Sequence, residues 1–359
     1  MNIALVHEYL NQYGGAERLL QVLTALIPQA PIFTMLYDER MTGGVFRGRR
    51  IETTFLQSMP FSKTAHHMYS PFMPMAVEQM DLRAYDVVLS VSASFAKGVI
   101  VHPHARHICY CLTPPRFLWD QSHEFLERFR LPWPLSSLSP LALSYLRVWD
   151  QQAATRVDTW LAVSQCARAR IQKYYRVDAR VVYPPVNIDA FPVSDTPGSY
   201  WLMVGRLVAY KRFDVAIEAF NRSGLPLVIV GAGVEEGRLR SMARPNISFA
   251  GQVDDARLSE LYRQSYGVVF PQEEDFGIVP LEAMASGKPV VAFRAGGALE
   301  TVVDRITGLF FDTQTPEAIE EAVSRAMNTK WLPHVCRGQA ERFSVEKFCA
   351  AIQSVIMEQ

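Results

Sequence analysis

The chain has 359 residues, which is enough for two domains of ordinary size. Hydrophobic residues make up 49% of the chain and charged residues 20%, a composition typical of well-packed globular proteins. Because 36 basic side chains balance 36 acidic ones, no overall electrostatic field recruits nucleic acid, and we expect no nucleic-acid partner.

Cysteine usage and the lack of long apolar runs indicate the compartment. The five cysteines are scattered among apolar residues without metal-ligand spacing, which favours a reduced, cytoplasmic protein. The N-terminus enters a strand without a basic leader, and no apolar run approaches the roughly 18 residues that span a bilayer. We therefore predict a cytoplasmic protein and leave open a peripheral contact with the inner face of the cell membrane.

In the first half of the chain, short apolar segments alternate with segments of helical character. A glycine pair, Gly14-Gly15, stands between the first predicted strand and a predicted helix at 16–26. This alternation predicts a mainly parallel sheet with right-handed crossovers. The predicted strands are residues 3–7, 31–35, 86–91, 108–111 and 159–163.

The turn-rich segment FPVSDTPG, residues 191–198, marks the predicted boundary between two domains. We predict an N-terminal domain at 1–193, a C-terminal domain at 194–343 and a final helical segment at 344–359. Both domains have the pattern of doubly wound α/β sheets, which bind ligands at the carboxyl ends of their strands. The predicted strands of the second domain are residues 201–204, 227–230, 247–249, 267–270 and 290–293.

The first turn of the second domain carries two cations. The sequence WLMVGRLVAYK, residues 201–211, reads as a strand and a glycine turn with Arg206 and Lys211, and an amphipathic helix follows from residue 213. Cations on a strand-to-helix turn are well placed to bind a diphosphate. The plainer alternative is that both are solvated surface residues.

An acidic turn, EDFGIVPLE at 274–282, follows a later buried strand and opens a short helix. The free amides of such a helix start can bind an anion, and Pro280 suits the first helical turn. Glu274 and Glu282 flank this anion site, and carboxylates accept hydrogen bonds from hydroxyls, so a nucleotide-sugar fits. The plainer alternative is a helix whose acidic start complements the macrodipole.

Together these motifs carry a family resemblance. GRLVAYKRFD, GAG, GQV and EDFGIVPLEAMASGKPVVA resemble family 4 of the retaining glycosyltransferases, which have the α/β GT-B fold of two facing Rossmann-like domains with an interdomain cleft. Arg206 and Lys211 match that family's Arg-four residues-Lys spacing, and Glu274 and Glu282 match its Glu-seven residues-Glu spacing. GGAER, YCLTPPRFLWD and VVYPPVNIDAF are similar to mannosyltransferases of bacterial O-antigen and exopolysaccharide synthesis.

The resemblance implies a catalytic role for three residues. Arg206 and Lys211 would neutralise the diphosphate of the donor, so we expect neither a metal nor another cofactor. Glu274 would hold hexose hydroxyls and orient the anomeric carbon, and we do not assign it as a nucleophile, unlike the paired acids of retaining glycosidases. Glu282 would accept hydrogen bonds from the ribose hydroxyls.

The resemblance also implies donor contacts made mainly by backbone. In the first domain the small Gly14 and Gly15 would let a helix start approach the phosphates, and the final helix would cross back to that domain. In the second domain the expected donor-binding residues are Gln252, Val253, Phe276, Gly277 and Ile278.

The acceptor side is expected on the YCLTPPRFLWD segment. Arg116 could pair with an acceptor phosphate and Trp119 could stack on a sugar ring, with Asp120 beside them; an equal alternative is a loop anchored on its Trp. Relatives commonly carry His where this chain has Leu112. We predict that His107, at the other end of the strand, is a buried histidine with a structural partner.

The predicted function is transfer of a hexose, with mannose from GDP-mannose as the first choice, to a lipid-linked saccharide acceptor. The apolar segment 131–149 is either an interfacial patch for that acceptor or an ordinary loop and helix. Alternatives are a transferase that uses a UDP-hexose, a non-catalytic protein that binds sugar-nucleotide or lipid phosphate, and a dehydrogenase. The last has only the partial glycine motif at 231–233 in its favour.

Overall fold

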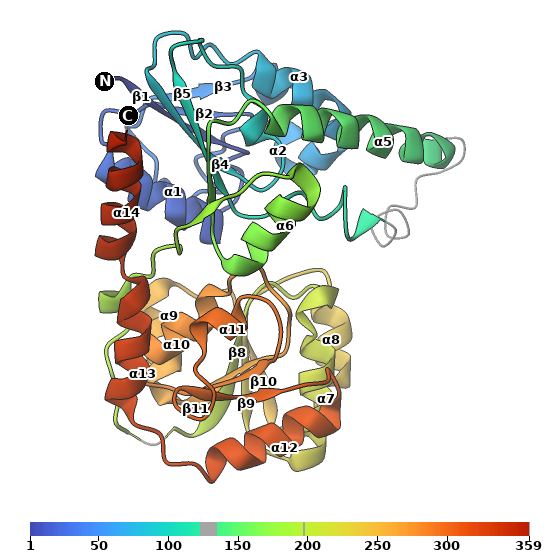
Figure 1. Cartoon of the computed structure of the whole chain (residues 1–359). Coiled ribbons are helices and arrows are strands. Elements are labelled where there is room, and N and C mark those ends of the chain that lie inside the picture. The colour runs from blue at the N-terminus through green and yellow to red at the C-terminus, as the bar shows by residue number, and fades with distance from the viewer. Residues whose placement is uncertain (123–134, 197, 359) are drawn as a thin grey trace. The chain divides into compact units, whose positions relative to one another are not determined.

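A computed structural model describes residues 1–122, 135–196 and 198–358. The chain divides into two compact units, Met1–Tyr183 with Cys349–Gln359, and Pro184–Phe348. The first unit thus ends at 183, where the sequence led us to expect 193, and the chain returns to it at 349, where we expected 344. Figure 1 shows each unit as a layer of strands flanked by helices.

The first unit contains a seven-stranded, entirely parallel sheet in the order β3-β2-β1-β4-β5-β6-β7. The direction in which strands are added reverses between β1 and β4, which lie side by side in the sheet. The strands are β1 (Ile3–His7), β2 (Ile32–Thr34), β3 (Ile51–Thr53), β4 (Val87–Ser92), β5 (Arg106–Cys111), β6 (Thr159–Ala162) and β7 (Arg180–Val181).

Helices and short 3-10 turns connect these strands (Figure 1). They are α1 (Gly15–Leu26), η1 (Phe55–Ser58), α2 (Ser62–Ala65), η2 (His66–Phe72), α3 (Met73–Glu78), η3 (Ala96–Gly98), α5 (Leu135–Ala154) and α6 (Gln165–Tyr175). Of the apolar segment 131–149, residues 131–134 lie outside the described residues. On α5, Leu141, Tyr145 and Val148 are exposed, whereas Leu143 and Leu146 are buried.

The second unit contains a six-stranded parallel sheet in the order β10-β9-β8-β11-β12-β13. This is again the doubly wound arrangement, here reversing between β8 and β11. The strands are β8 (Tyr200–Val204), β9 (Leu227–Val230), β10 (Ile247–Gly251), β11 (Ser265–Phe270), β12 (Val290–Phe293) and β13 (Gly308–Phe311).

Helices also follow the strands of the second unit. They are η4 (Ile188–Ala190), η5 (Ala209–Lys211), α7 (Phe213–Ser223), α8 (Glu236–Met242), α9 (Asp255–Gln264), α10 (Ile278–Ala285), α11 (Ala298–Thr301), α12 (Pro316–Met327), α13 (Pro333–Ala340) and η6 (Glu341–Phe343). A last helix, α14 (Val345–Met357), returns to the first unit, where Arg106 donates a 2.8 Å hydrogen bond to the carbonyl oxygen of Val355.

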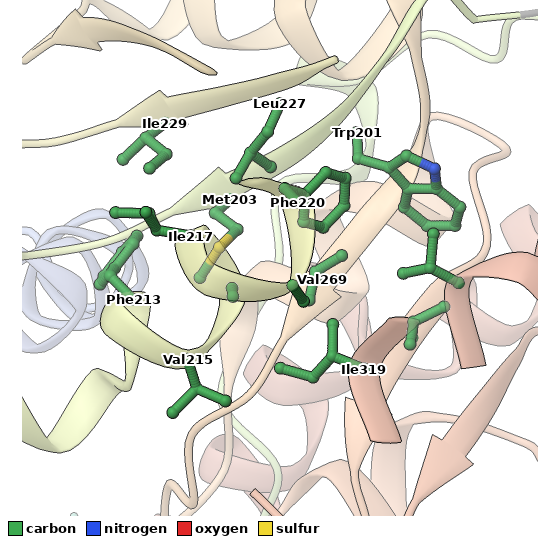
Figure 2. Packing of buried hydrophobic residues seen from close by; sticks show 14 of the residues in the cluster. Trp201, Met203, Phe213, Val215, Ile217, Phe220, Leu227, Ile229, Val269 and Ile319 are labelled. Atoms are coloured by element: carbon green, nitrogen blue, oxygen red, sulfur yellow. The ribbon is translucent and has the colours of Figure 1, made fainter. Parts of the chain in front are cut away.

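The core of the second unit forms where α7 packs on the sheet. Trp201 and Met203 alternate along β8 and point to the same side, as a strand requires. On α7, Phe213, Ile217 and Phe220 follow helical spacing and meet them, as Figure 2 shows. This packing anchors the two ends of the β8–α7 turn, which carries the two predicted cations, on the sheet.

None of the helices in the described ranges combines the length and the apolar composition needed to cross a bilayer.

Candidate functional site

The candidate site lies at the point where the strand order of the second unit reverses. β8 and β11 are neighbouring parallel strands, with Val268 of β11 in register with Leu202 of β8. Their carboxyl ends therefore lie at the same edge of the sheet, and so do the turns that follow them. In doubly wound sheets this is where ligands bind.

An ion pair joins these two turns. The Nζ of Lys211, at the end of the β8–α7 turn, donates to Oε1 of Glu274 in the β11–α10 turn. The Lys211 side chain is 10% exposed and that of Glu274 is 20% exposed, so the pair is largely shielded but still reachable from solvent. The structure thus brings together two of the three predicted catalytic residues.

Further contacts hold the β11–α10 turn in place. Gln272 donates from Nε2 to Oε1 of Glu274 over 3.3 Å, and the backbone N–H of Gly297 donates to the carbonyl oxygen of Glu274 over 2.8 Å. Gln314 donates from its side chain to the carbonyl oxygen of Pro271 over 2.6 Å and accepts from Arg212 over 3.3 Å. Glu274 is therefore fixed at both its side chain and its backbone. Sequence reasoning named neither glutamine.

The third predicted catalytic residue, Arg206, is exposed. Within the part of the chain that the structure describes, its guanidinium makes no hydrogen bond or ion pair. Its neighbour on the turn, Leu207, is fully buried. The guanidinium is consequently free to meet an anion that approaches the turn from solvent.

The start of α10 presents backbone amides. Gly277 is the N-cap residue, at a positive φ of 84°, and no side chain caps the helix. A Cβ built on Gly277 would lie 2.9 Å from the Cζ of Phe270, so glycine is required there by backbone conformation and by space. Phe276 before it is buried and Ile278 after it is half-buried. Uncapped N–H groups at a helix start are suited to an anion.

Glu282 lies on the inner side of α10 and is 7% exposed. Its Oε2 accepts a 2.8 Å hydrogen bond from the hydroxyl of Tyr262, a residue of α9 that is fully buried. The predicted partner of a ribose is therefore already engaged with a tyrosine that the sequence did not single out. The only feature of the sequence that could have predicted the burial of Tyr262 is the periodic apolar face of the helix that contains it.

Gln252 and Val253 follow β10, at the edge of the sheet. Gln252 is exposed and Val253 is half-buried. Among the described residues, neither makes a side-chain hydrogen bond with Lys211, Glu274 or Glu282. Their expected contact with the donor remains a prediction.

The glycine turn of the first unit is clamped by a buried carboxylate. Glu17 accepts hydrogen bonds from the N–H of Gly14 over 2.8 Å and from Gln12 over 3.3 Å, and it lies 3.5 Å from Nε2 of His7. Burial by itself would raise the pKa of Glu17, but the hydrogen bond and the charge of His7, with the backbone hydrogen bonds, bring it below its usual value. Gly15, the first residue of α1, is exposed.

A second buried carboxylate, Glu8, marks the reversal point of the first sheet. It directly follows β1 and is 5% exposed. Its two oxygens accept from the backbone amides of residues 93–96 and from the hydroxyls of Ser92 and Ser94, all between 2.7 and 3.2 Å. These hydrogen bonds give partners to the backbone amides and hydroxyls of the turn after β4. A polar residue at the end of an apolar strand is the sequence signal that could have indicated Glu8.

Trp119 anchors the predicted acceptor-side loop. Its Nε1 donates to Oδ2 of the fully buried Asp150 over 2.9 Å, and its ring stacks on Tyr174 with centroids 4.8 Å apart. Arg116 and Asp120 form an ion pair of 3.4 Å. One face of the indole is therefore occupied by Tyr174, which favours the anchoring role over sugar stacking.

His107 is a buried histidine with a structural partner, as predicted. It is fully buried, and its Nε2 lies 2.9 Å from the hydroxyl oxygen of Ser90. Burial lowers the pKa of His107 to about 4. Its imidazole is therefore neutral at physiological pH and belongs to the core of the first sheet.

Comparison with known sequences gives a family match within the second unit. Residues 187–343 match the family model described as glycosyl transferases group 1. An uncharacterized glycosyltransferase of Methanocaldococcus jannaschii is 26% identical over 221 residues, which cover 59% of this chain and 63% of that protein. A GDP-mannose-dependent alpha-mannosyltransferase of Mycolicibacterium smegmatis is 32% identical over 176 residues, 46% of this chain and 47% of that one. The chain thus spans less than two thirds of the length of these curated relatives.

Comparison of structures covers the whole chain. The HepE protein of Anabaena, solved in complex with UDP and glucose, superposes with a TM-score of 0.74 at 17% identity and covers 100% of both chains. At this identity the likeness concerns the fold alone. Together with the two parallel sheets of seven and six strands, it confirms the predicted fold class: this chain has the GT-B fold of glycosyltransferases.

Proposed function

We propose that this protein is a retaining glycosyltransferase that moves a hexose from a nucleoside-diphosphate sugar to a lipid-linked saccharide acceptor. The observation that carries the proposal is the contact between Lys211 and Glu274 at the reversal point of the second sheet. It sets a cation for phosphate and a carboxylate for hydroxyls side by side, next to the uncapped start of α10. The family match over 187–343 supports it.

In the proposed reaction the two cations bind and stabilise the diphosphate of the donor. As the bond from the anomeric carbon to the phosphate oxygen breaks, negative charge grows on the leaving diphosphate. Lys211, Arg206 and the amides at Gly277 would stabilise that charge, and one well-aimed donor of this kind contributes about 3 kcal/mol. The arriving phosphate competes with Glu274 for Lys211, which couples donor binding to release of the carboxylate.

Retention follows if the acceptor hydroxyl attacks from the face that the diphosphate leaves. The new bond joins the acceptor oxygen to the anomeric carbon, and the hydroxyl proton passes to the leaving phosphate oxygen. No carboxylate nucleophile is needed. Glu274 then holds hexose hydroxyls, and Glu282 serves the ribose.

GDP-mannose is the donor that we propose, within bacterial O-antigen or exopolysaccharide synthesis. The N-terminal motifs support this choice, and so does the mannosyltransferase of Mycolicibacterium smegmatis. A UDP-hexose is the second candidate, because the structurally similar HepE protein binds UDP and glucose. We further propose cytoplasmic transfer at the inner face of the cell membrane, supported by the exposed Leu141, Tyr145 and Val148 of α5.

A donor panel tests the proposal. Purified protein is incubated with GDP-mannose, UDP-glucose, UDP-galactose and UDP-N-acetylglucosamine, and thermal shift and release of free nucleotide are recorded with and without a chelator. We expect one donor to raise the Tm and to be turned over equally in both buffers. The anomeric configuration of the product, read by NMR, tests retention. A non-catalytic binder would give the Tm shift without turnover, and activity lost with chelator would contradict metal-independent transfer.

A further inference from the structure

Gln272 is a buried amide placed directly behind the candidate catalytic carboxylate. It follows Pro271 at the end of β11 and is 1% exposed. Its Nε2 donates to Oε1 of Glu274 over 3.3 Å, and the same oxygen accepts from Nζ of Lys211. Two donors from different turns of the second unit therefore converge on one oxygen of one carboxylate.

The two oxygens of Glu274 are consequently unequal. Within the described residues, Oε2 accepts no hydrogen bond, although the side chain as a whole is 20% exposed. A free carboxylate rotates broadly about its last bond, so its two oxygens exchange readily. Donors fixed on one side remove that freedom. Oε2 is thereby left as the oxygen that can accept a hydrogen bond from a ligand.

The buried amide of Gln272 lowers the stability of the folded protein. Its own Oε1 is buried and has no hydrogen-bond partner within the described part of the chain. An unsatisfied buried acceptor destabilises the fold, and an apolar side chain of the same shape would avoid that loss. Gln272 lowers the stability of the fold and at the same time donates to the candidate catalytic carboxylate. Residues that reduce stability in this way are typical of functional sites.

We propose that Gln272 is a positioning residue for hexose transfer. Its Nε2 holds Oε1 of Glu274, so that Oε2 faces the hydroxyls of the donor hexose. The inference rests on the proposed function and adds to it a residue that selects between the sugar and the nucleotide parts of the donor. Lys211 and the start of α10 serve the diphosphate, whereas Gln272 acts only on the hexose contact.

The test is the substitution Gln272→Met, which keeps the shape of the side chain and removes both amide atoms. We expect an unchanged or higher Tm, an unchanged Kd for the free nucleoside diphosphate, and a kcat lowered roughly 10- to 100-fold. The gain in affinity that the hexose gives the nucleotide-sugar over the free nucleotide should fall. A merely structural role would lower the Tm instead and leave that gain intact.

Two comparisons sharpen the test. Gln339→Met is the matched control, because Gln339 is also a buried glutamine of the second unit, 8% exposed, and donates to the carbonyl oxygen of Thr301. It should leave kcat unchanged. In a Glu274→Ala background, Gln272→Met should not weaken nucleotide-sugar binding further, because the carboxylate that Gln272 holds is already absent.

The outcomes separate two failures. If the wild type turns over a donor and Gln272→Met keeps kcat and the hexose gain within twofold, the positioning role is overturned and the proposed function stands. An additive loss in the Glu274→Ala background would likewise overturn it, since Gln272 would then act independently of Glu274. If the wild type neither binds nor turns over any nucleotide-sugar, the proposed function fails, and this inference fails with it.

Discussion

Lys211 and Glu274 lie 63 residues apart in the sequence and form an ion pair, because β8 and β11 are neighbours in the second sheet. A parallel pair of strands ends at one edge, so the turns after the two strands meet. The pair occupies the place where a doubly wound sheet receives its ligand.

Lys211→Met should lower kcat for donor turnover roughly a hundredfold or more, because the leaving diphosphate loses a shielded cation. Folding should survive, since the methionine retains an apolar stem and Glu274 still reaches solvent. Steady-state turnover and thermal unfolding measure the two effects. Lys330→Met, at an exposed position of the same unit, is the control and should match the wild type. Near-normal turnover by Lys211→Met would remove the diphosphate role.

Arg206→Ala should also lower turnover roughly a hundredfold, by the same loss of charge stabilisation. Its effect on stability should differ from that at Lys211. The guanidinium is exposed and pairs with no other described residue, so the Tm should remain unchanged. Arg206→Lys keeps the charge and should recover part of the rate. Kinetics combined with thermal unfolding decides, and a drop in Tm would mean that Arg206 holds the fold.

Glu274→Ala should reduce transfer more than Glu282→Ala does, whereas the effects on stability should be reversed. Glu282 is buried and accepts from the hydroxyl of Tyr262, so its removal costs about 1–3 kcal/mol. Urea unfolding and transfer assays on both variants measure this. Adding Tyr262→Phe to Glu282→Ala should restore part of the stability. The opposite order of rates would mean that the two carboxylates have exchanged roles.

Gly231→Ala should destabilise the second unit by about 3 kcal/mol or more. Gly231 has a φ of 130°, and a Cβ built on it would lie 1.9 Å from the carbonyl oxygen of Gly205. Gly237→Ala is the control, because that residue lies in α8 with open space around its Cβ. It should raise stability by about 0.5–1 kcal/mol. Equal Tm values for the two variants would contradict the close approach.

His107 should make stability depend on pH between about 6.5 and 4. Burial lowers the pKa of His107 from 6.5 to about 4, so below pH 6.5 the unfolded chain binds a proton that the folded protein does not. Stability is therefore full above pH 6.5 and falls with pH, by about 2 kcal/mol between pH 7 and 5. Urea unfolding of His107→Asn should show a smaller fall, whereas the exposed His334→Gln should behave as wild type. Equal pH slopes in all three proteins would contradict the shift.

The strands that the sequence predicted well are the ones with continuous apolar runs. β1, β9 and β12 have the predicted bounds, since each is an apolar run closed by polar or turn residues. β3 was missed because it is a three-residue edge strand with Glu52 and Thr53 exposed. β7 has only two residues, too few for a period to show, and β13 was also missed.

At the candidate site, the sequence predicted the residues that match the motif spacings of the glycosyltransferase resemblance, and it did not predict Gln272. Arg206, Lys211, Glu274 and Glu282 stand at fixed intervals around two turns. Gln272 has no such interval. Its proposed role depends on the direction of its side chain after β11 and on the turn that lies opposite. Neither can be predicted from one polar residue in the sequence.

The sequence by itself determined the two α/β units and the turns that hold charge, because periodicity and turn chemistry act over a few residues, and its motifs carry the resemblance to glycosyltransferases. Only the tertiary structure decided which charges meet. In the fold, Lys211 forms an ion pair with Glu274, Gln272 donates a hydrogen bond to Glu274, and Tyr262 donates one to Glu282. Strand order and register bring distant segments to one sheet edge, and burial then favours hydrogen bonds between the polar groups that meet there.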